Sequence, residues 1–175
     1  MRKLSILAIA AMLLIGSMPA ASAHSRSGQV YFGYAEGVVT FDFGNPKGCE
    51  SGFTTVTDTS GWALRTGRTD MDSTHCVVPY GAPEDNLATV HSAEMVLTAR
   101  NGDEIHAKYE LIIKPFMPVE IGQKVVAEGT VTFDGGTGRY EDATGTAYIR
   151  NVVTFEGFED PEWASRAFWI GRIDT

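Results

Sequence analysis

Three polar side chains, His91, Tyr109 and Asn151, fall at positions that strand alternation predicts to face the interior. The other inward positions around them are apolar and form the expected wall of a cavity: Met95, Leu111, Val125 and Val153. A hydrophobic cavity with a few convergent polar groups is the usual form of a small-molecule site. This set therefore predicts binding of a small apolar molecule. In the alternative interpretation His91 lies in solvent at the start of a strand, while Tyr109 and Asn151 are hydrogen-bonded core residues.

These residue types do not specify a reaction. The inward positions contain no paired carboxylates, no nucleophile–histidine–acid triad and no metal-binding set. Two classes stay open: a module that binds a molecule without changing it, and an enzyme that steers the cyclisation or coupling of a reactive small molecule through shape and a few polar groups. The sequence favours binding, and no cofactor is expected.

A histidine at the mature N-terminus would offer a different chemistry. The amine and ring of His24 could bind copper together with His75, His91 or His106, as in exported copper proteins. The competing interpretation is a loose chain end that happens to begin with histidine. His75 is expected to be a loop residue rather than a ligand. We therefore predict no metal site and keep the copper protein as a minor alternative.

The chain begins with the three parts of a secretory signal. Arg2-Lys3 precedes an apolar run at 4–15, and an Ala-Ser-Ala cleavage site ends a signal peptide at residues 1–23. The apolar run is too short to span a bilayer comfortably. We expect cleavage to leave one domain, residues 24–175, without a membrane-spanning segment and located in the periplasm or secreted.

The expected mature chain is strongly acidic. The full chain has a formal net charge of −8, and loss of Arg2 and Lys3 would make it −10. Because there is no cluster of basic residues, the chain is a poor candidate for binding nucleic acid or an anionic membrane.

The two cysteines, Cys49 and Cys76, both lie in the exported part. In an oxidising compartment such a pair predicts one disulfide bond. A metal site is the weaker interpretation, because no second cysteine or histidine lies at ligand spacing around Cys49. Closing this loop should stabilise the fold by about 3 kcal/mol in the chain-entropy account.

After the signal, runs rich in Val, Thr, Ile, Phe and Tyr alternate with Gly, Asn, Asp and Pro clusters, which is typical of successive short strands. Eight strands are predicted, at 29–43, 53–59, 62–69, 89–99, 103–113, 123–134, 144–156 and 163–173. Two long proline-containing loops, 70–88 and 114–122, complete the chain. No repeat or linker divides it.

The hairpin at Asn101-Gly102 can be resolved to its register. A two-residue loop would place apolar residues opposite polar ones. A three-residue loop, residues 100–102, instead sets Leu97 opposite Ile105 and leaves Gly102 at a position that needs a left-handed backbone. The pattern therefore predicts the three-residue loop.

Alternation in the later strands gives one dry face and one face of threonine and charge, which suits antiparallel strands joined in chain order. Eight such strands can close into an up-and-down barrel, which removes the exposed edges of an open sheet. In that order Cys49 and Cys76 fall at the same end of the barrel, as a disulfide requires.

A glycine-rich segment, Asp134 to Gly145 (DGGTGRYEDATG), joins two predicted strands. Its glycines allow a tight turn, and Tyr140 and Ala143 are expected to pack over the barrel end. A phosphate-binding loop is excluded because no Gly-Lys-Ser/Thr and no helix pattern follow. The loop is predicted to be structural, through these residues: Gly135, Gly136, Gly138, Arg139 and Tyr140.

This segment resembles the Gly-Gly-Thr-Gly-Arg-aromatic…Ala-Thr-Gly stretch of small exported bacterial proteins in the allene oxide cyclase/dirigent-like barrel superfamily. The strand and turn at 97–103 (LTARNGD) are also similar, and the resemblance covers roughly residues 50–156. It implies an eight-stranded barrel with an apolar cavity, often assembled as a trimer. The better-known relatives cyclise an oxylipin or guide radical coupling. Their active-site residues do not match positions in this chain, so none is assigned.

The last predicted strand is apolar on both faces. Phe168 and Ile170 fall on the outward side, flanked by Arg166 and Arg172. A strand of this kind is either covered by another segment or forms a subunit contact. Together with the resemblance, this predicts a homo-oligomer, with a trimer as the expected form.

Overall fold

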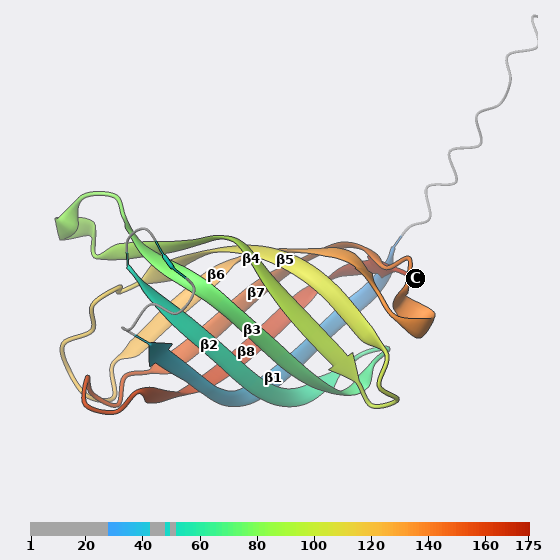
Figure 1. Ribbon diagram of the computed structural model, residues 1–175, viewed down its shortest axis with the longest axis horizontal. Helices are drawn as coiled ribbons and strands as arrows, with labels where there is room; N and C mark the ends of the chain where they lie inside the picture. Colours follow the sequence, from blue (N-terminus) through green and yellow to red (C-terminus); the bar gives the residue numbers. More distant parts are fainter. Residues whose placement is uncertain (1–27, 43–47, 50–51) are drawn as a thin grey trace, which may run out of the picture.

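Alternating inward and outward residues run along eight strands, which close the sheet on itself as an up-and-down antiparallel barrel (Figure 1). The structure is a computed structural model that describes residues 28–42, 48, 49 and 52–175; the predicted signal peptide and His24 lie outside them. The strands are β1 (Gln29–Asp42), β2 (Phe53–Ala63), β3 (Gly67–Tyr80), β4 (Leu87–Ala99), β5 (Glu104–Lys114), β6 (Lys124–Gly136), β7 (Thr144–Thr154) and β8 (Glu162–Asp174). The predicted fold class is confirmed.

Strand β6 illustrates why the sheet curls around an apolar interior. Val125, Ala127, Val131 and Phe133 are buried, and the residues between them are mostly exposed or partly exposed. Because the side chains of one strand alternate between faces, a strand of this pattern has one dry side and one wet side. The other strands repeat the pattern, so all dry sides meet on the barrel axis.

The β4–β5 hairpin has the predicted register. Leu97 pairs with Ile105 across a three-residue turn, and Met95 pairs with Ala107. Gly102 has a φ of +85°, the left-handed conformation that glycine adopts without strain. The prediction of a three-residue loop is confirmed.

Strands β2 and β3 are longer than predicted. Strand β2 continues to Ala63, the turn lies at 64–66, and β3 runs on to Tyr80. The predicted long loop at 70–88 is therefore wrong: most of it is strand, and only 81–86 connects β3 to β4, including the short 3₁₀ helix η1 (Pro83–Asp85). Because β3 extends to Tyr80, His75 and Cys76 lie within a strand rather than in a loop.

The predicted disulfide is present. Cys49 and Cys76 are bonded, with a Cα–Cα distance of 5.7 Å and a sequence separation of 27 residues. The bond ties Cys49, which precedes β2, to the last third of β3.

The glycine-rich segment closes one end of the barrel, which we call the closed end (right in Figure 1). Its 3₁₀ helix η2 (Gly138–Tyr140) places Tyr140 in the core, where its hydroxyl donates to the carbonyl oxygen of Arg65 over 3.1 Å. Gly138 has a φ of +57°, and a Cβ there would lie 2.2 Å from Oδ1 of Asp103. Ala143 is fully buried. The segment therefore packs Tyr140 and Ala143 over this end of the barrel.

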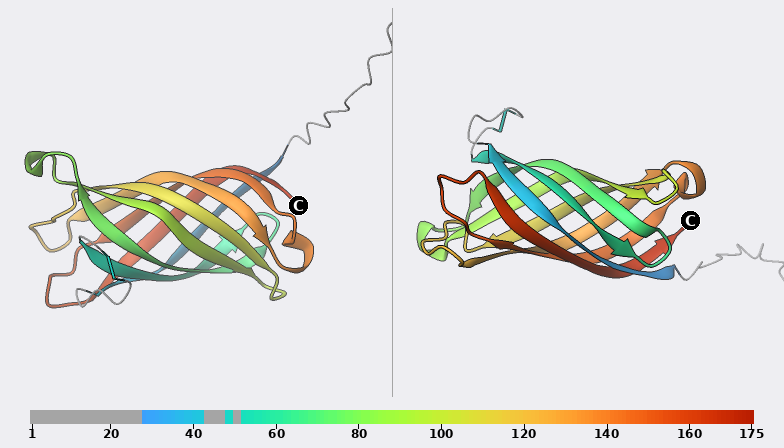
Figure 2. Two further views of the ribbon diagram at one scale, coloured as in Figure 1. Left: turned by 45° about the horizontal axis from the view of Figure 1, so that its top comes forward. Right: turned by 90° about the horizontal axis from the view of Figure 1, so that it is seen from below.

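The connections at 81–86, 115–123 and 155–161 lie at the opposite end, together with the end of β1 and the start of β2, and we call this end the mouth (left in Figure 1). Figure 2 shows the strands crossing the barrel obliquely between the two ends. In the half nearest the closed end, large side chains fill the axis: Tyr31 contacts both Phe133 and Trp169, with Tyr31–Phe133 ring centroids 5.4 Å apart.

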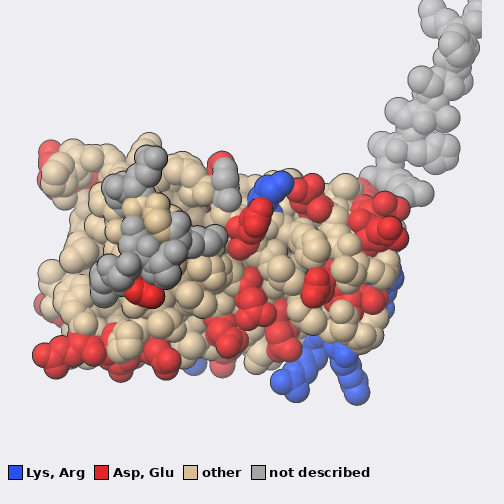
Figure 3. Space-filling view, in the orientation of Figure 1, with Lys and Arg blue, Asp and Glu red and all other residues tan. Residues whose placement is uncertain are grey.

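Acidic side chains outnumber basic ones on the face in Figure 3. An exception to the polar exterior is the outer aromatic patch, formed by exposed residues on neighbouring strands β7, β8, β1 and β2: Phe32, Tyr34, Trp62, Tyr148, Phe168 and Ile170. Phe168 and Ile170 thus point outward, as predicted. Among the described residues, no helix is long and apolar enough to cross a membrane.

Candidate functional site

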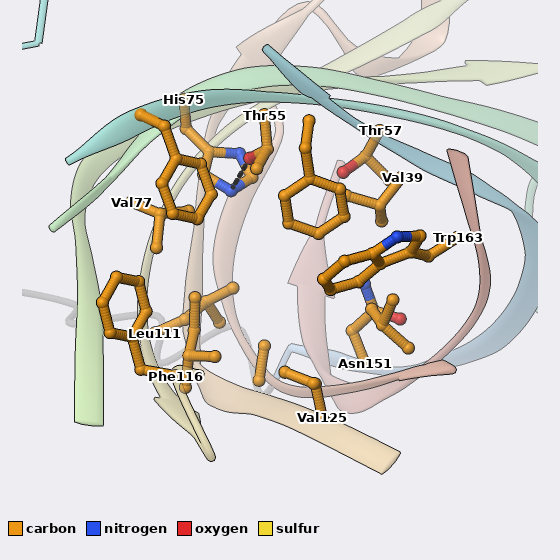
Figure 4. Close-up of a pocket in the computed structure, with 15 residues that line it drawn as sticks. Val39, Thr55, Thr57, His75, Val77, Leu111, Phe116, Val125, Asn151 and Trp163 are labelled. Atoms are coloured by element: carbon orange, nitrogen blue, oxygen red, sulfur yellow. Dashed lines mark hydrogen bonds between the residues drawn. The ribbon is translucent and has the colours of Figure 1, made fainter. Parts of the chain in front are cut away.

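A cavity lies in the mouth half of the barrel, and Figure 4 shows the side chains that line it. Its enclosed volume is about 60 Å³, and the space is about 520 Å³ when open solvent at the entrance is included. Its wall is formed by Val39, Phe41, Phe53, Thr55, Thr57, His75, Val77, Leu111, Ile113, Phe116, Val125, Ala127, Asn151, Val153 and Trp163. The lining is mostly apolar, and its polar members come from only three strands.

Aromatic rings surround the outer part of the cavity. Phe53 stacks on Phe116 at 5.8 Å between ring centroids, and Phe41 contacts both Phe53 and Trp163. The indole nitrogen of Trp163 donates to the carbonyl oxygens of Gly157 and Asp160, each over 3.0 Å, which holds the ring beneath the β7–β8 connection. This shell, which we call the aromatic rim, is positioned by hydrogen bonds as well as by packing.

Polar groups line the next level inward. His75 lies between two hydroxyls: its Nε2 is 2.6 Å from Oγ1 of Thr55, and its Nδ1 is 2.5 Å from the hydroxyl of Tyr109. Thr55 and His75 are register partners on β2 and β3, whereas Tyr109 comes from β5. The β4 residue paired with Tyr109 is Ala93, and its small side chain leaves room for the histidine and the tyrosine to meet. We call these three residues the polar chain.

The polar chain can run in either direction. Burial raises the pKa of the Tyr109 hydroxyl well above its usual range, while a hydrogen bond with Ser73 offsets part of the rise, so this hydroxyl stays protonated at neutral pH. If Tyr109 donates to Nδ1 of His75, Nε2 carries the proton and donates to Thr55. In the opposite tautomer His75 donates to Tyr109 and accepts from Thr55. Either way the chain ends on the Thr55 hydroxyl at the cavity wall.

Asn151 faces the polar chain from the opposite wall of the cavity (Figure 4). Its Oδ1 accepts a hydrogen bond of 2.8 Å from the hydroxyl of Ser165. The partner fixes the amide in place, so the group is held ready rather than free to turn.

The predicted site residues are only partly brought together. Leu111, Val125, Asn151 and Val153 line the cavity as expected, and Tyr109 lies directly behind it through its bond to His75. Met95 is buried deeper, at a small void of about 10 Å³ in the filled half of the barrel.

His91 does not line the cavity. The register changes from Val90 opposite Leu111 to Ala93 opposite Tyr109, so one extra residue is inserted in β4. A bulge of this kind reverses the alternation on one side of the insertion. Val90 therefore points inward and His91 is exposed, with its Nε2 3.1 Å from the Thr89 hydroxyl. The prediction that His91 forms part of the mouth is wrong for this reason.

His75 takes the place that the sequence assigned to His91. It was predicted to lie in a loop, whereas it is buried and inward in β3. A usable signal was present: Thr69, Met71, His75 and Val77 share one parity, and charged residues occupy the alternate positions from Arg68 to Asp72. Pro79 and Pro83, which follow this stretch, favoured a loop over a strand in the prediction.

The copper partners proposed for His24 do not come together. His75 is inside the barrel, His91 is exposed on β4, and His106 is on the exterior of β5, 2.9 Å from Glu104. Within the described part of the chain, no group of three or more His, Cys, Asp or Glu side chains could hold a metal ion. His24 itself lies outside that part.

What the site can do follows from its geometry. The cavity can remove an apolar molecule from water, and the hydroxyl of Thr55 and the amide of Asn151 can each donate or accept one hydrogen bond from it. Comparisons with protein-family models, with curated proteins and with solved structures found no match to this chain.

Proposed function

We propose that this chain is an exported β-barrel protein, periplasmic or secreted, that binds one small apolar molecule in the cavity at its mouth. The observation that carries the proposal is the combination of a mostly apolar cavity with a few fixed polar groups on its wall. The enclosed space of about 60 Å³ suits a small or slender apolar group, and the cavity is open to solvent at the mouth.

Export is supported independently. Residues 1–23 have the pattern of a secretory signal, and the Cys49–Cys76 disulfide is a feature of oxidising compartments. Both observations agree with an encounter between this protein and its ligand outside the cytoplasm.

The binding proposal is tested by titration with N-phenyl-1-naphthylamine, an apolar dye that fluoresces in dry surroundings. We expect saturable binding with a blue-shifted emission. In Ala127→Leu the added carbons occupy the cavity, so affinity should fall about tenfold or more. Thr130→Leu, on the outward side of the same strand, is the matched control and should bind like the wild type. Absence of saturable binding by the wild type would refute the proposal.

Native mass spectrometry of protein purified from its own host identifies the natural occupant. A retained mass that is lost in Ala127→Leu would assign that mass to the cavity.

A second candidate function is an enzyme of the cyclase-like or dirigent-like kind. The observation in its favour is that two ionisable groups, His75 and Tyr109, meet at 2.5 Å beside the cavity. Such a pair can hold or move a proton next to a bound reactive intermediate. The resemblance of residues 134–145 to the allene oxide cyclase/dirigent-like superfamily agrees with this candidate.

Binding and catalysis differ in the fate of the occupant. The molecule identified by mass spectrometry is incubated with wild-type protein and with His75→Gln, and the recovered compound is analysed for mass and stereochemistry. A change produced by the wild type and not by the variant supports catalysis. An unchanged compound in both reactions contradicts it and leaves binding as the function.

We also propose that copies of this chain associate through the outer aromatic patch, with a trimer as the expected form. Cross-strand register sets Tyr34 beside both Trp62 and Phe168, and Phe32 beside Ile170. Four arginines border the patch through the same registers: Arg68, Arg150, Arg166 and Arg172. Aromatic residues with arginine are the composition typical of protein interfaces, and a second copy of this acidic chain supplies carboxylates for the arginines.

Light scattering tests the assembly. We expect Phe168→Glu to produce monomers while leaving the fold intact. Phe158→Glu is the matched control, because Phe158 at the mouth is as exposed as Phe168, 54% against 53%. A monomeric wild type at tens of micromolar would contradict self-association.

A further inference from the structure

We propose that the molecule in the cavity is a neutral amphiphile that enters head first: an uncharged oxygen function lies on Thr55 and Asn151, and the apolar body lies against the aromatic rim. This inference rests on the proposed binding function and names its ligand class. The head group is therefore a hydroxyl or a carbonyl, and a carboxylate or an ammonium does not fit the site.

The depth of the polar groups gives the direction of entry. Thr55 lies two residues farther from the mouth than Phe53 on β2, and the register partners show the same order on β3, where His75 lies inside Val77. On β7, Asn151 lies inside Val153. The polar groups therefore sit behind the apolar rim, so an extended amphiphile satisfies both only with its polar end inward.

Charge excludes an ionised head. Among the described lining residues, His75 is the only titratable side chain, and both of its ring nitrogens already lie within hydrogen-bond distance of hydroxyls. A carboxylate or ammonium moved to this depth would lose its hydration and gain no opposite charge. The mouth connections are acidic, through Glu120, Glu156 and Glu159 among others, which further disfavours an anion.

The polar chain suits an oxygen function that is neutral. Because the chain can reverse, the Thr55 hydroxyl can donate to a carbonyl oxygen or accept from a hydroxyl. The ligand therefore contacts Thr55 directly, and His75 and Tyr109 act through it as positioning residues.

The head group is tested by displacement of N-phenyl-1-naphthylamine with four probes of equal chain length: 1-octanol, octane, octanoate and octylammonium, at neutral pH. We expect 1-octanol to displace the dye at about three- to tenfold lower concentration than octane, the range of one net hydrogen bond. The two ions should be weaker than 1-octanol. Thr55→Val removes the hydroxyl at nearly constant shape and should abolish the advantage of octanol over octane. Thr130→Val, on the outer face of β6, is the matched control and should preserve it.

The orientation is tested by bromine quenching of tryptophan fluorescence. 8-Bromo-1-octanol carries its bromine at the tail, so it should quench Trp163 at the rim, and Trp163→Phe should lose that quenching. 2-Bromo-1-octanol carries the bromine near the head and should quench less. Stronger quenching by the 2-bromo compound would overturn the direction of entry.

The outcomes separate the two proposals. If the dye and octane bind but octanoate equals or exceeds octanol, or Thr55→Val leaves the octanol advantage intact, the head-group inference is wrong and apolar binding stands. If neither the dye nor any probe binds, the proposed function fails and the inference fails with it.

Discussion

The two ends of the barrel share their strands and their alternation but differ in what occupies the axis. At the closed end, Tyr31, Phe133 and Trp169 pack together, and Tyr140 seals the opening from the glycine-rich loop. At the mouth the corresponding positions hold smaller or peripheral side chains, and a cavity results. Alternation decides which side of a strand is dry, whereas the sizes of the inward residues decide whether the dry space is filled.

One glycine shows how the closed end is filled. A Cβ at Gly33 would lie 2.4 Å from the ring of Trp169. The missing side chain therefore allows the indole to lie against β1. The closed end thus depends on a large residue and its matching small partner, and such interlocking is sensitive to change in either direction.

The largest expected effect comes from emptying the closed end. Trp169→Ala should lower the free energy of unfolding by about 3–5 kcal/mol, because a buried ring is replaced by a void. Tyr80→Ala is the control, since Tyr80 on β3 is 53% exposed and lies outside the outer aromatic patch. Urea denaturation measures both variants. Equal losses would show that the closed end is not the stable half of the barrel.

Removing the disulfide tests the mouth in the same way. The variant Cys49→Ala/Cys76→Ala should lose about 3 kcal/mol of unfolding free energy. The wild-type protein should show no reactive thiol when it is denatured without a reductant, and two reactive thiols after reduction. Two titratable thiols in exported protein that has not been reduced would contradict the bond.

Alkaline pH offers a smaller and more local test of the closed end. Burial raises the pKa of Tyr31 to about 12, although Thr66 and Trp169 offset part of the rise. The unfolded chain loses this proton near pH 10. The free energy that the raised pKa of Tyr31 contributes to stability is therefore fully present below pH 10. About 2–3 kcal/mol of it is lost as the pH rises toward 12.

Tyr31→Phe should reduce that loss. Thr66 and Trp169 lie near the Tyr31 hydroxyl, but neither makes a hydrogen bond of ordinary geometry with it, so the variant should fold normally at neutral pH. Urea midpoints measured at several pH values between about 9 and 12 give the slope. An unchanged slope in the variant would show that Tyr31 is not the group that titrates.

The smallest expected effect compares the same substitution in both halves. Ala147 borders a void of only about 10 Å³, whereas Ala127 lines the open cavity. Ala147→Leu should cost about 1–3 kcal/mol through overpacking, and Ala127→Leu should cost little. The difference in urea midpoint is the measurement. Equal costs would mean that the cavity collapses in solution.

Sequence reasoning recovered what depends on alternation and on turn chemistry. The β4–β5 register followed from matching Leu97 with Ile105 and from the demand for glycine at position 102. The disulfide followed from a pair of cysteines in an exported chain, and the strand order allowed it by placing both at the same end of the barrel. Leu111, Val125, Asn151 and Val153 were placed correctly because β5, β6 and β7 keep their alternation across the cavity wall.

The errors arose where a local signal had a non-local cause. The predicted strands 53–59 and 62–69 leave a break at 60–61, but Gly61 lies within β2, where a Cβ would come 1.9 Å from the carbonyl oxygen of Tyr34 on β1. The glycine serves close strand approach rather than chain reversal. The bulge in β4 likewise has no clear mark in the sequence. It turns His91 to the outside, and the histidine that lines the cavity is His75 on β3.

The packed side chains that fill the closed end have a consequence for the rates of ligand binding and release. Among the described residues, the proposed ligand would enter and leave past Phe41, Phe53, Phe116 and Trp163. For the proposed ligand, the same ring movements would limit both arrival and departure. Residence time would then depend on how readily the rim rings move, whereas affinity would depend on the contacts that the rim and the wall behind it make with the bound molecule.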